Sequence, residues 1–261
     1  MATRRHVPRK RFGQHFLVDR EAIARIVSAI DPRHEDHIVE IGPGLGALTA
    51  PLLERVGHLH VVELDRDLSE HLRERYPAGR LAVHQADALR FDFSALPAPL
   101  RVVGNLPYNI STPLLFHLAD AATRCKDLHF MLQHEVVERM IANPADSEYG
   151  RLSVMLQYRF RLERLFSVPP GSFRPPPKVH SAVVRLVPRP LSELDALDEA
   201  GFSKVVAQAF SMRRKTLRNN LSSLISASEL DELGIDPGER AQTLSVAAFV
   251  TIANRVGQRR T

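Results

Sequence analysis

The stretch HIVEIGPGLG, residues 37–46, decides the fold. Its first half, His37–Ile41, is mostly apolar and predicts a buried strand. Gly42, Gly44 and Gly46 follow, and a helical pattern begins directly after them. Glycine at such a turn lets the backbone approach a ligand closely, and the amino terminus of the next helix attracts negative groups. The stretch therefore predicts a strand, a nucleotide-type loop and a helix.

Short apolar runs alternate with amphipathic stretches along most of the chain, which is the pattern of a parallel sheet covered by helices. We expect strands at 37–41, 59–64, 81–85, 100–103, 128–132, 162–168 and 182–187, and helices at 20–30, 45–56, 67–75, 113–121, 135–141 and 152–160. The proline-rich loop 169–177 reads as the turn of a final hairpin. After residues 188–190 the strand pattern ends, and the remainder is helical in period. We therefore expect domains at 19–188 and 189–261, preceded by an arm at 1–18.

Composition limits the possible functions. With 261 residues and 44% hydrophobic content, the chain can bury one sizeable core and a small second domain. It contains no apolar run of membrane-spanning length and no signal-peptide core, so we expect a cytoplasmic protein. Cys125 is the only cysteine, which excludes an internal disulfide and a cysteine-cluster zinc site. His58 and His60, the closest histidine pair, have no acidic or thiol partners, so we predict no metal site.

Positive charge is concentrated at the amino terminus. The net charge is +5, and the five basic residues that precede any acidic one account for it, namely Arg4, Arg5, Arg9, Lys10 and Arg11. Such an arm is the usual electrostatic footprint of phosphate contact. A solvated tail or an organelle presequence would also be basic. The following segment 12–17, with two aromatic residues and a glycine, argues against both alternatives.

Acidic side chains end the next two predicted strands. Glu63 lies nineteen residues beyond Gly44, and Asp87 closes the third strand. An acidic residue at that spacing can accept hydrogen bonds from both ribose hydroxyls of a bound nucleotide, so NAD and S-adenosylmethionine are both candidates. A plain strand-to-helix turn would also carry glycines. The order Gly-Pro-Gly-Leu-Gly differs from the G-x-G-x-x-G of pyrophosphate loops, and this favours S-adenosylmethionine.

The fourth strand ends in GNLPYNIS, residues 104–111, which contains no cysteine, histidine or carboxylate. Methyl transfer from a sulfonium needs an aligned acceptor but no enzymic nucleophile. If the acceptor is the exocyclic amine of adenine, the side-chain oxygen of Asn105 and the carbonyl of Leu106 could accept its hydrogens. Pro107 would fix the direction of that carbonyl, and Tyr108 would stack on the base. The motif therefore predicts a clamp for a base.

These motifs resemble those of the ribosomal RNA adenine dimethyltransferase (dimethyladenosine transferase) family. RKRFGQHFL, EIGPGLG, ELD, QAD, GNLPYNIS and FRPPPKVHSAVV stand in the order and spacing of that family, and the resemblance covers essentially the whole chain. It implies a Rossmann-like class I S-adenosylmethionine-dependent methyltransferase fold, α/β, with a mostly parallel seven-stranded sheet, helices on both faces and a final antiparallel hairpin. A small all-α C-terminal domain that contacts RNA is implied as well.

The resemblance also implies roles for individual residues. Phe173 would stack on the target base from the side opposite Tyr108. The arm at 1–18 would cap the cofactor. The expected contacts to S-adenosylmethionine are His15, Leu17, Gly42, Gly44, Glu63, Asp87 and Asn105, and the expected RNA contacts are Arg9, Lys10, Arg11, Arg213, Arg214, Lys215 and Arg218. We expect the last four to lie on a helix, where they could also be an ordinary solvated face.

The implied reaction is dimethylation of two adjacent adenosines near the 3′ end of small-subunit ribosomal RNA. The partner would be an immature small ribosomal subunit, and we expect a monomer. A DNA adenine methyltransferase would share the amine clamp, but such enzymes show Asp or Asn followed by two prolines and carry a separate base-reading domain. A non-enzymatic nucleic-acid-binding relative is the other alternative, although Glu63, Asp87 and Asn105 together argue against it.

Overall fold

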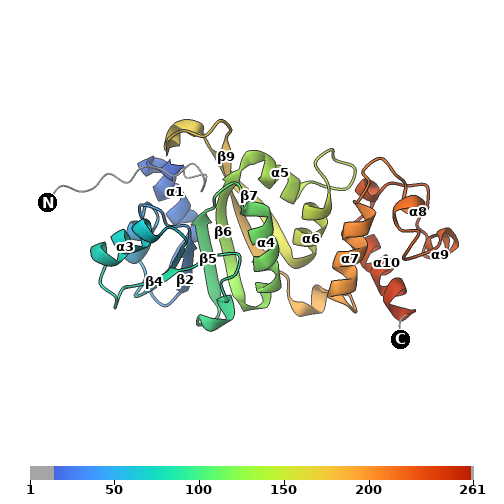
Figure 1. The fold of residues 1–261 in the computed structure, drawn as a ribbon, viewed down its shortest axis with the longest axis horizontal. Helices are drawn as coiled ribbons and strands as arrows, with labels where there is room; N and C mark the ends of the chain where they lie inside the picture. Colours follow the sequence, from blue (N-terminus) through green and yellow to red (C-terminus); the bar gives the residue numbers. More distant parts are fainter. Residues whose placement is uncertain (1–14, 260–261) are drawn as a thin grey trace. The chain divides into compact units, whose positions relative to one another are not determined.

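The structure, a computed structural model, describes residues 15–259 (Figure 1). The chain forms two compact units, which are described separately. The first comprises the residues up to Val137 together with Glu163–Pro188. The second comprises Glu138–Leu162 together with the residues from Arg189 onward.

A seven-stranded sheet is the centre of the first unit, and its strands are β2 (His37–Ile41), β3 (Leu59–Glu63), β4 (Leu81–Gln85), β5 (Leu100–Asn105), β6 (Cys125–Gln133), β7 (Phe160–Val168) and β9 (Ser181–Pro188). They lie side by side in the order β4-β3-β2-β5-β6-β9-β7 (Figure 1). The pairs from β4 to β6 are parallel, and β9 runs antiparallel to β6. The central strands β2 and β5 are buried at almost every position, as parallel strands covered on both faces must be.

The helices of this unit are α1 (Arg20–Ile30), α2 (Thr49–Leu53), α3 (Arg66–Arg75), α4 (Ser111–Asp120) and the first part of α5 (His134–Ile141). Side-chain caps mark the starts of α1 and α3: the Asp19 carboxylate accepts the backbone N–H groups of Glu21 and Ala22, and the Asp65 carboxylate accepts that of Asp67. Helix α2 is shorter than the expected 45–56. The glycine loop extends into the expected first turn, where Gly46 has φ 85° and donates to the Pro43 carbonyl.

A two-stranded sheet that the sequence did not predict joins β1 (Phe16–Leu17) to β8 (Phe173–Arg174) in antiparallel register. Hydrogen bonds between the two segments continue beyond the strands, since the Val18 amide donates to the Ser172 carbonyl. Ser172 donates to the cap residue Asp19 at 2.7 Å. The segment before α1 is therefore held against the proline-rich loop.

The second unit contains the helices α6 (Arg151–Arg159), α7 (Glu199–Ala209), α8 (Leu217–Asn220), α9 (Ala227–Glu232) and α10 (Val246–Gln258). One break between the units, at Pro188–Arg189, coincides with the domain boundary expected from the sequence. Residues 138–162 were expected in the first domain, but they group with the C-terminal helices. Their side chains Val154 and Tyr158 are buried in one apolar cluster with Phe202 and Phe249, which explains the grouping.

Candidate active site

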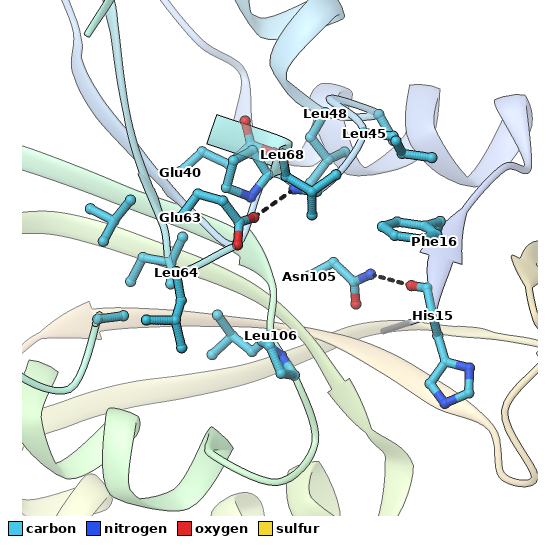
Figure 2. A pocket seen from close by; sticks show the side chains of 18 of the residues that line it. His15, Phe16, Glu40, Leu45, Leu48, Glu63, Leu64, Leu68, Asn105 and Leu106 are labelled. Atoms are coloured by element: carbon cyan, nitrogen blue, oxygen red, sulfur yellow. Dashed lines mark hydrogen bonds between the residues drawn. The ribbon is translucent and has the colours of Figure 1, made fainter. Parts of the chain in front are cut away.

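A cavity of about 300 Å³ lies in the first unit at the carboxyl ends of its parallel strands (Figure 2). Its lining includes Ile41 from β2, Glu63 from β3, Asp87 just after β4 and Asn105 from β5. Ligands of open α/β sheets bind at this edge, because the strand-to-helix loops gather there. The residues that the sequence predicted from separate strand ends are thus brought to one cavity.

The glycine loop forms one wall of the cavity. Gly42 and Gly44 have φ values of 66° and 58°, in the left-handed region that favours glycine. A Cβ atom on Gly44 would lie 3.1 Å from the ring of Phe16, which also lines the cavity. The loop can lie this close to the aromatic ring only because it carries no side chain at that position.

Glu63 projects into the cavity from the end of β3 and is oriented by two backbone donors (Figure 2). One carboxylate oxygen accepts from the Gly44 amide at 3.2 Å, and the other accepts from the Asp65 amide at 2.9 Å. The residue is 7% exposed. Burial raises the pKa of Glu63 above its usual value, while the two N–H groups oppose that shift. Each oxygen keeps a further lone pair with which to accept hydrogen bonds from a ligand.

Glu40 is a second buried carboxyl group at this cavity, and the sequence analysis gave it no role. It lies within β2 and accepts a hydrogen bond from the Thr49 hydroxyl at 2.6 Å. Burial, with the nearby Glu63 charge, raises the pKa of Glu40 to about 8. Glu40 is therefore largely protonated at neutral pH, unlike an ordinary surface glutamate. Its place in the EIGPG segment, directly before the glycine loop, was the available sequence clue.

Asn105 lies opposite Glu63 and has a fixed amide orientation. Its side-chain Nδ2 donates to the His15 carbonyl at 3.1 Å (Figure 2). The amide oxygen is thereby left as an acceptor. The backbone carbonyl of Leu106 accepts no hydrogen bond from any donor among residues 15–259, while its amide is bonded to the Met131 carbonyl. The Asn105 side-chain oxygen and the Leu106 carbonyl are thus two acceptors on consecutive residues of the cavity lining.

Tyr108 lines the cavity, is half-buried and is held by contacts with two other residues. Its hydroxyl is hydrogen-bonded to the Ser181 hydroxyl at 2.7 Å, and burial raises the pKa of the phenol. The His15 ring stacks on it with a centroid distance of 5.6 Å. His15 is itself held by a 2.8 Å contact between its Nδ1 and the Pro175 carbonyl. The sequence did not predict this pairing of His15 with Tyr108.

The other predicted site residues of the first unit do not all line the cavity. Leu17 and Pro107 line the cavity, as does Asp87, one of whose oxygens accepts from the Leu89 amide at 3.0 Å. Phe173 does not line it. Its side chain is 0% exposed and packs in the core with Leu17, because the strand pairing of β8 with β1 turns that ring inward. The structure therefore does not place Phe173 where it could stack on a base.

The predicted RNA-contacting residues lie elsewhere. Arg9, Lys10 and Arg11 are outside the described residues. In the second unit, the basic cluster is exposed, but the expectation of a single helix is wrong. Residues 213–215 form the turn between α7 and α8, and only Arg218 is helical. The chain must change direction there, which a continuous helix would prevent.

The model of the ribosomal RNA adenine dimethylase family matches residues 5–258. The chain belongs to this family. Among curated members, the ribosomal RNA small subunit methyltransferase A of Aromatoleum aromaticum is 61% identical, over 96% of this chain and 95% of its own length. The protein of that name from Chromobacterium violaceum is 58% identical, over 97% of both chains.

Solved structures of similar proteins share the fold of this chain. A dimethyladenosine transferase from Plasmodium falciparum superposes with a TM-score of 0.81 at 26% identity, covering 93% of this chain and 98% of the other. The 23S rRNA methyltransferase ErmE gives 0.68 at 27% identity, covering 93% and 100%. The predicted class I methyltransferase fold, the family and S-adenosylmethionine-dependent adenine dimethylation of ribosomal RNA are confirmed.

The cavity suits S-adenosylmethionine. The Glu63 carboxylate can accept hydrogen bonds from hydroxyl groups such as those of a ribose, and the Asp87 carboxylate can accept one from an amine such as that of adenine. No group of three or more His, Cys, Asp and Glu side chains among residues 15–259 is arranged to hold a metal. In the same part of the chain, every helix is too short or too polar to cross a membrane.

Proposed function

We propose that the chain adds two methyl groups to the 6-amino group of each of two adjacent adenosines near the 3′ end of small-subunit ribosomal RNA. We place it in the cytoplasm, acting as a monomer on a small subunit that is still immature. The names of its relatives support the choice of RNA.

The observation that carries the proposal is the fixed amide of Asn105 beside the Leu106 carbonyl. Because one N–H of the Asn105 amide is bonded to the His15 carbonyl, the direction of the amide oxygen is set, and this oxygen can accept a hydrogen from a substrate amine. Two acceptors bind the two amine hydrogens, so the nitrogen lone pair is directed away from both of them. An adenine amine needs this help because its lone pair is delocalised into the ring.

At the other side of the cavity, Glu63 would hold the ribose of S-adenosylmethionine and the glycine loop its methionine portion. S-adenosylmethionine brings the activated methyl group, so the protein needs no nucleophile of its own. Residues 15–18 and the loop 105–110 also line the cavity. Their role is to align the amine and to exclude water from the methyl group.

Tyr108 would support the flipped target base. Its hydroxyl is bonded to Ser181, so its ring plane is set before RNA arrives. The second unit would contribute phosphate contacts through its exposed residues Arg213, Arg214, Lys215 and Arg218.

Replacement of Asn105 by Ala tests the clamp. We expect methyl transfer to immature small subunits, measured in a single turnover at saturating S-adenosylmethionine, to fall by about 10²–10³. Binding of RNA and folding should be near normal. Asn143→Ala is the matched control, because Asn143 is an exposed amide that does not line the cavity. Near-normal transfer by Asn105→Ala would refute the clamp.

A further inference from the structure

The second unit contains its own cavity, which the methyl-transfer reaction does not use. Its volume is about 300 Å³. Three arginines line it, Arg139, Arg151 and Arg213, against one acidic residue, Glu148. The remaining walls include the aromatic side chains Tyr149 and Phe210 and the amide side chain of Gln242. Positive charge, an aromatic surface and an amide together are the chemistry that recognises a nucleotide.

Hydrogen bonds tie the walls of this cavity together. The Tyr149 hydroxyl donates to the Leu244 carbonyl at 2.9 Å, and the Ala145 amide donates to the Gln242 carbonyl at 2.8 Å. Arg213 donates to the Ser147 carbonyl at 2.6 Å. The loop before α6 is thus fastened to two segments that lie far from it in the sequence.

The charges and the aromatic rings occupy different parts of the lining. Tyr149 is almost fully buried, and Phe210 is half-buried and meets it edge to face, with 6.3 Å between ring centroids. Arg151 and Arg213 are exposed. Arg151 is the first residue of the nine-residue helix α6, whose positive dipole end therefore adds to the arginine charge at this opening.

Gln242 provides the hydrogen-bonding specificity that arginines and rings lack. Its side-chain amide is only partly buried and makes no hydrogen bond to any residue among 15–259, although its backbone carbonyl does. A carboxamide can donate to and accept from the edge of a nucleobase at once. A base lying against Phe210 would present such an edge.

We propose that this cavity receives an unpaired nucleotide of the substrate RNA, distinct from the methylated adenosines. Its phosphate lies between Arg151 and Arg213, its base rests against Phe210, and Gln242 bonds the edge of the base. The inference rests on the proposed function and adds a second point at which single-stranded RNA is held. Such a site would fix the position of the RNA while the target adenosine enters the active site.

The test measures binding of immature small ribosomal subunits and of S-adenosylmethionine by each variant, at several salt concentrations. Arg151→Gln should lower the slope of log affinity against log salt by about 0.7–0.9, the loss of one phosphate contact. Phe210→Leu should weaken subunit binding on the order of five- to a hundredfold and leave the salt slope unchanged. Gln242→Ala should also weaken subunit binding and leave the salt slope unchanged, and this substitution does not alter the apolar core. S-adenosylmethionine binding should be normal in all three.

Lys204→Gln is the matched control, since it removes an exposed positive charge from the same unit outside the cavity. The inference is overturned if the wild-type chain binds and methylates subunits while Arg151→Gln and Gln242→Ala bind them as tightly as Lys204→Gln does. Failure of the wild-type chain to methylate subunits would instead refute the proposed function. Thermal unfolding of each variant separates a folding defect in Phe210→Leu from lost stacking, and Gln242→Ala remains decisive in that case.

Discussion

Glu40 and Glu63 line the same cavity, yet their different environments predict different chemistry. Glu63 lines the cavity and accepts hydrogen bonds from two backbone N–H groups, whereas Glu40 is more deeply buried and accepts one from the Thr49 hydroxyl. A hydrogen bond to a charged acceptor contributes about 1.5–3 kcal/mol, so loss of the Glu63 charge should weaken binding of a ribose diol.

Glu63→Gln should therefore reduce the affinity for S-adenosylmethionine by at least about tenfold while the protein stays folded, as measured by calorimetry. Glu40→Gln should change that affinity far less at pH 7, because Glu40 is already largely protonated there. Equal losses of affinity in the two variants would contradict this assignment.

Glu40 should also make stability depend on pH. In the unfolded chain this carboxyl ionises near its usual pKa of 4.5, whereas in the folded chain its pKa is about 8. The unfolded state therefore binds fewer protons between these values, and the free energy of unfolding falls as pH rises from 4.5 to 8. Glu40→Gln should remove this component, so its free energy of unfolding relative to the wild type should increase across that range. If denaturant titrations give a difference in the free energy of unfolding that does not change with pH, burial does not shift the pKa of Glu40.

Gly104 explains why the clamp motif begins with glycine. A Cβ atom at this position would lie 2.4 Å from the Ile41 carbonyl oxygen on the neighbouring strand β2. Because that obstacle is backbone, the two strands would have to separate. Gly104→Ala should cost about 1–3 kcal/mol of unfolding free energy and displace Asn105, lowering turnover as well. Gly79→Ala is the control, since a Cβ there meets no atom within 4 Å.

At the scale of elements, β3 and β4 place a group of histidine rings together. His60 Nδ1 and His84 Nε2 are 3.1 Å apart, with their rings stacked, and His58 packs edge-on against His60. Burial, with the charges of neighbouring histidines, lowers the pKa of His60 to about 4. Burial also lowers the pKa of His84. The pair can therefore share a hydrogen bond only while at least one ring is neutral.

This pair should make the first unit sensitive to acid. The unfolded chain protonates His60 near pH 6.5 and the folded chain only near 4, so the free energy of unfolding should fall as pH drops through this window. His60→Gln should show a weaker fall than the wild type between pH 6.5 and pH 4. His71→Gln, on α3 and outside the ring group, should behave like the wild type. If the free energy of unfolding depends on pH in the same way in the wild type and in His60→Gln, the interpretation is refuted.

At the scale of the whole molecule, the net positive charge is carried by the amino-terminal arm. Replacing Arg9, Lys10 and Arg11 by Ala should weaken RNA binding and reduce the salt slope by about 0.7–0.9 for each lost phosphate contact. Affinity for S-adenosylmethionine should change less. If the triple variant keeps the wild-type salt slope in titrations with immature subunits, the arm does not contact phosphates.

The sequence by itself determined the order of the elements and the composition of the catalytic edge. All seven strands of the main sheet and its helices occur close to the expected positions, because apolar periodicity, helix caps and glycine conformations act over a few neighbouring residues. Glu63, Asp87 and Asn105 could be placed together from the same local information. Parallel strands that alternate with helices bring their carboxyl ends to one edge.

Only the tertiary structure decided how distant segments meet. Asn105 takes its orientation from His15, ninety residues earlier, and Tyr108 is held by Ser181. Phe173 is in the core because β8 pairs with β1, although the family resemblance implied a ring that stacks on the target base. Such contacts depend on how complete elements pack, and burial of one side chain is settled by residues that no local pattern identifies. For that reason the sequence predicted which groups reach the cavity, while the packing determined which of their atoms are free to bind.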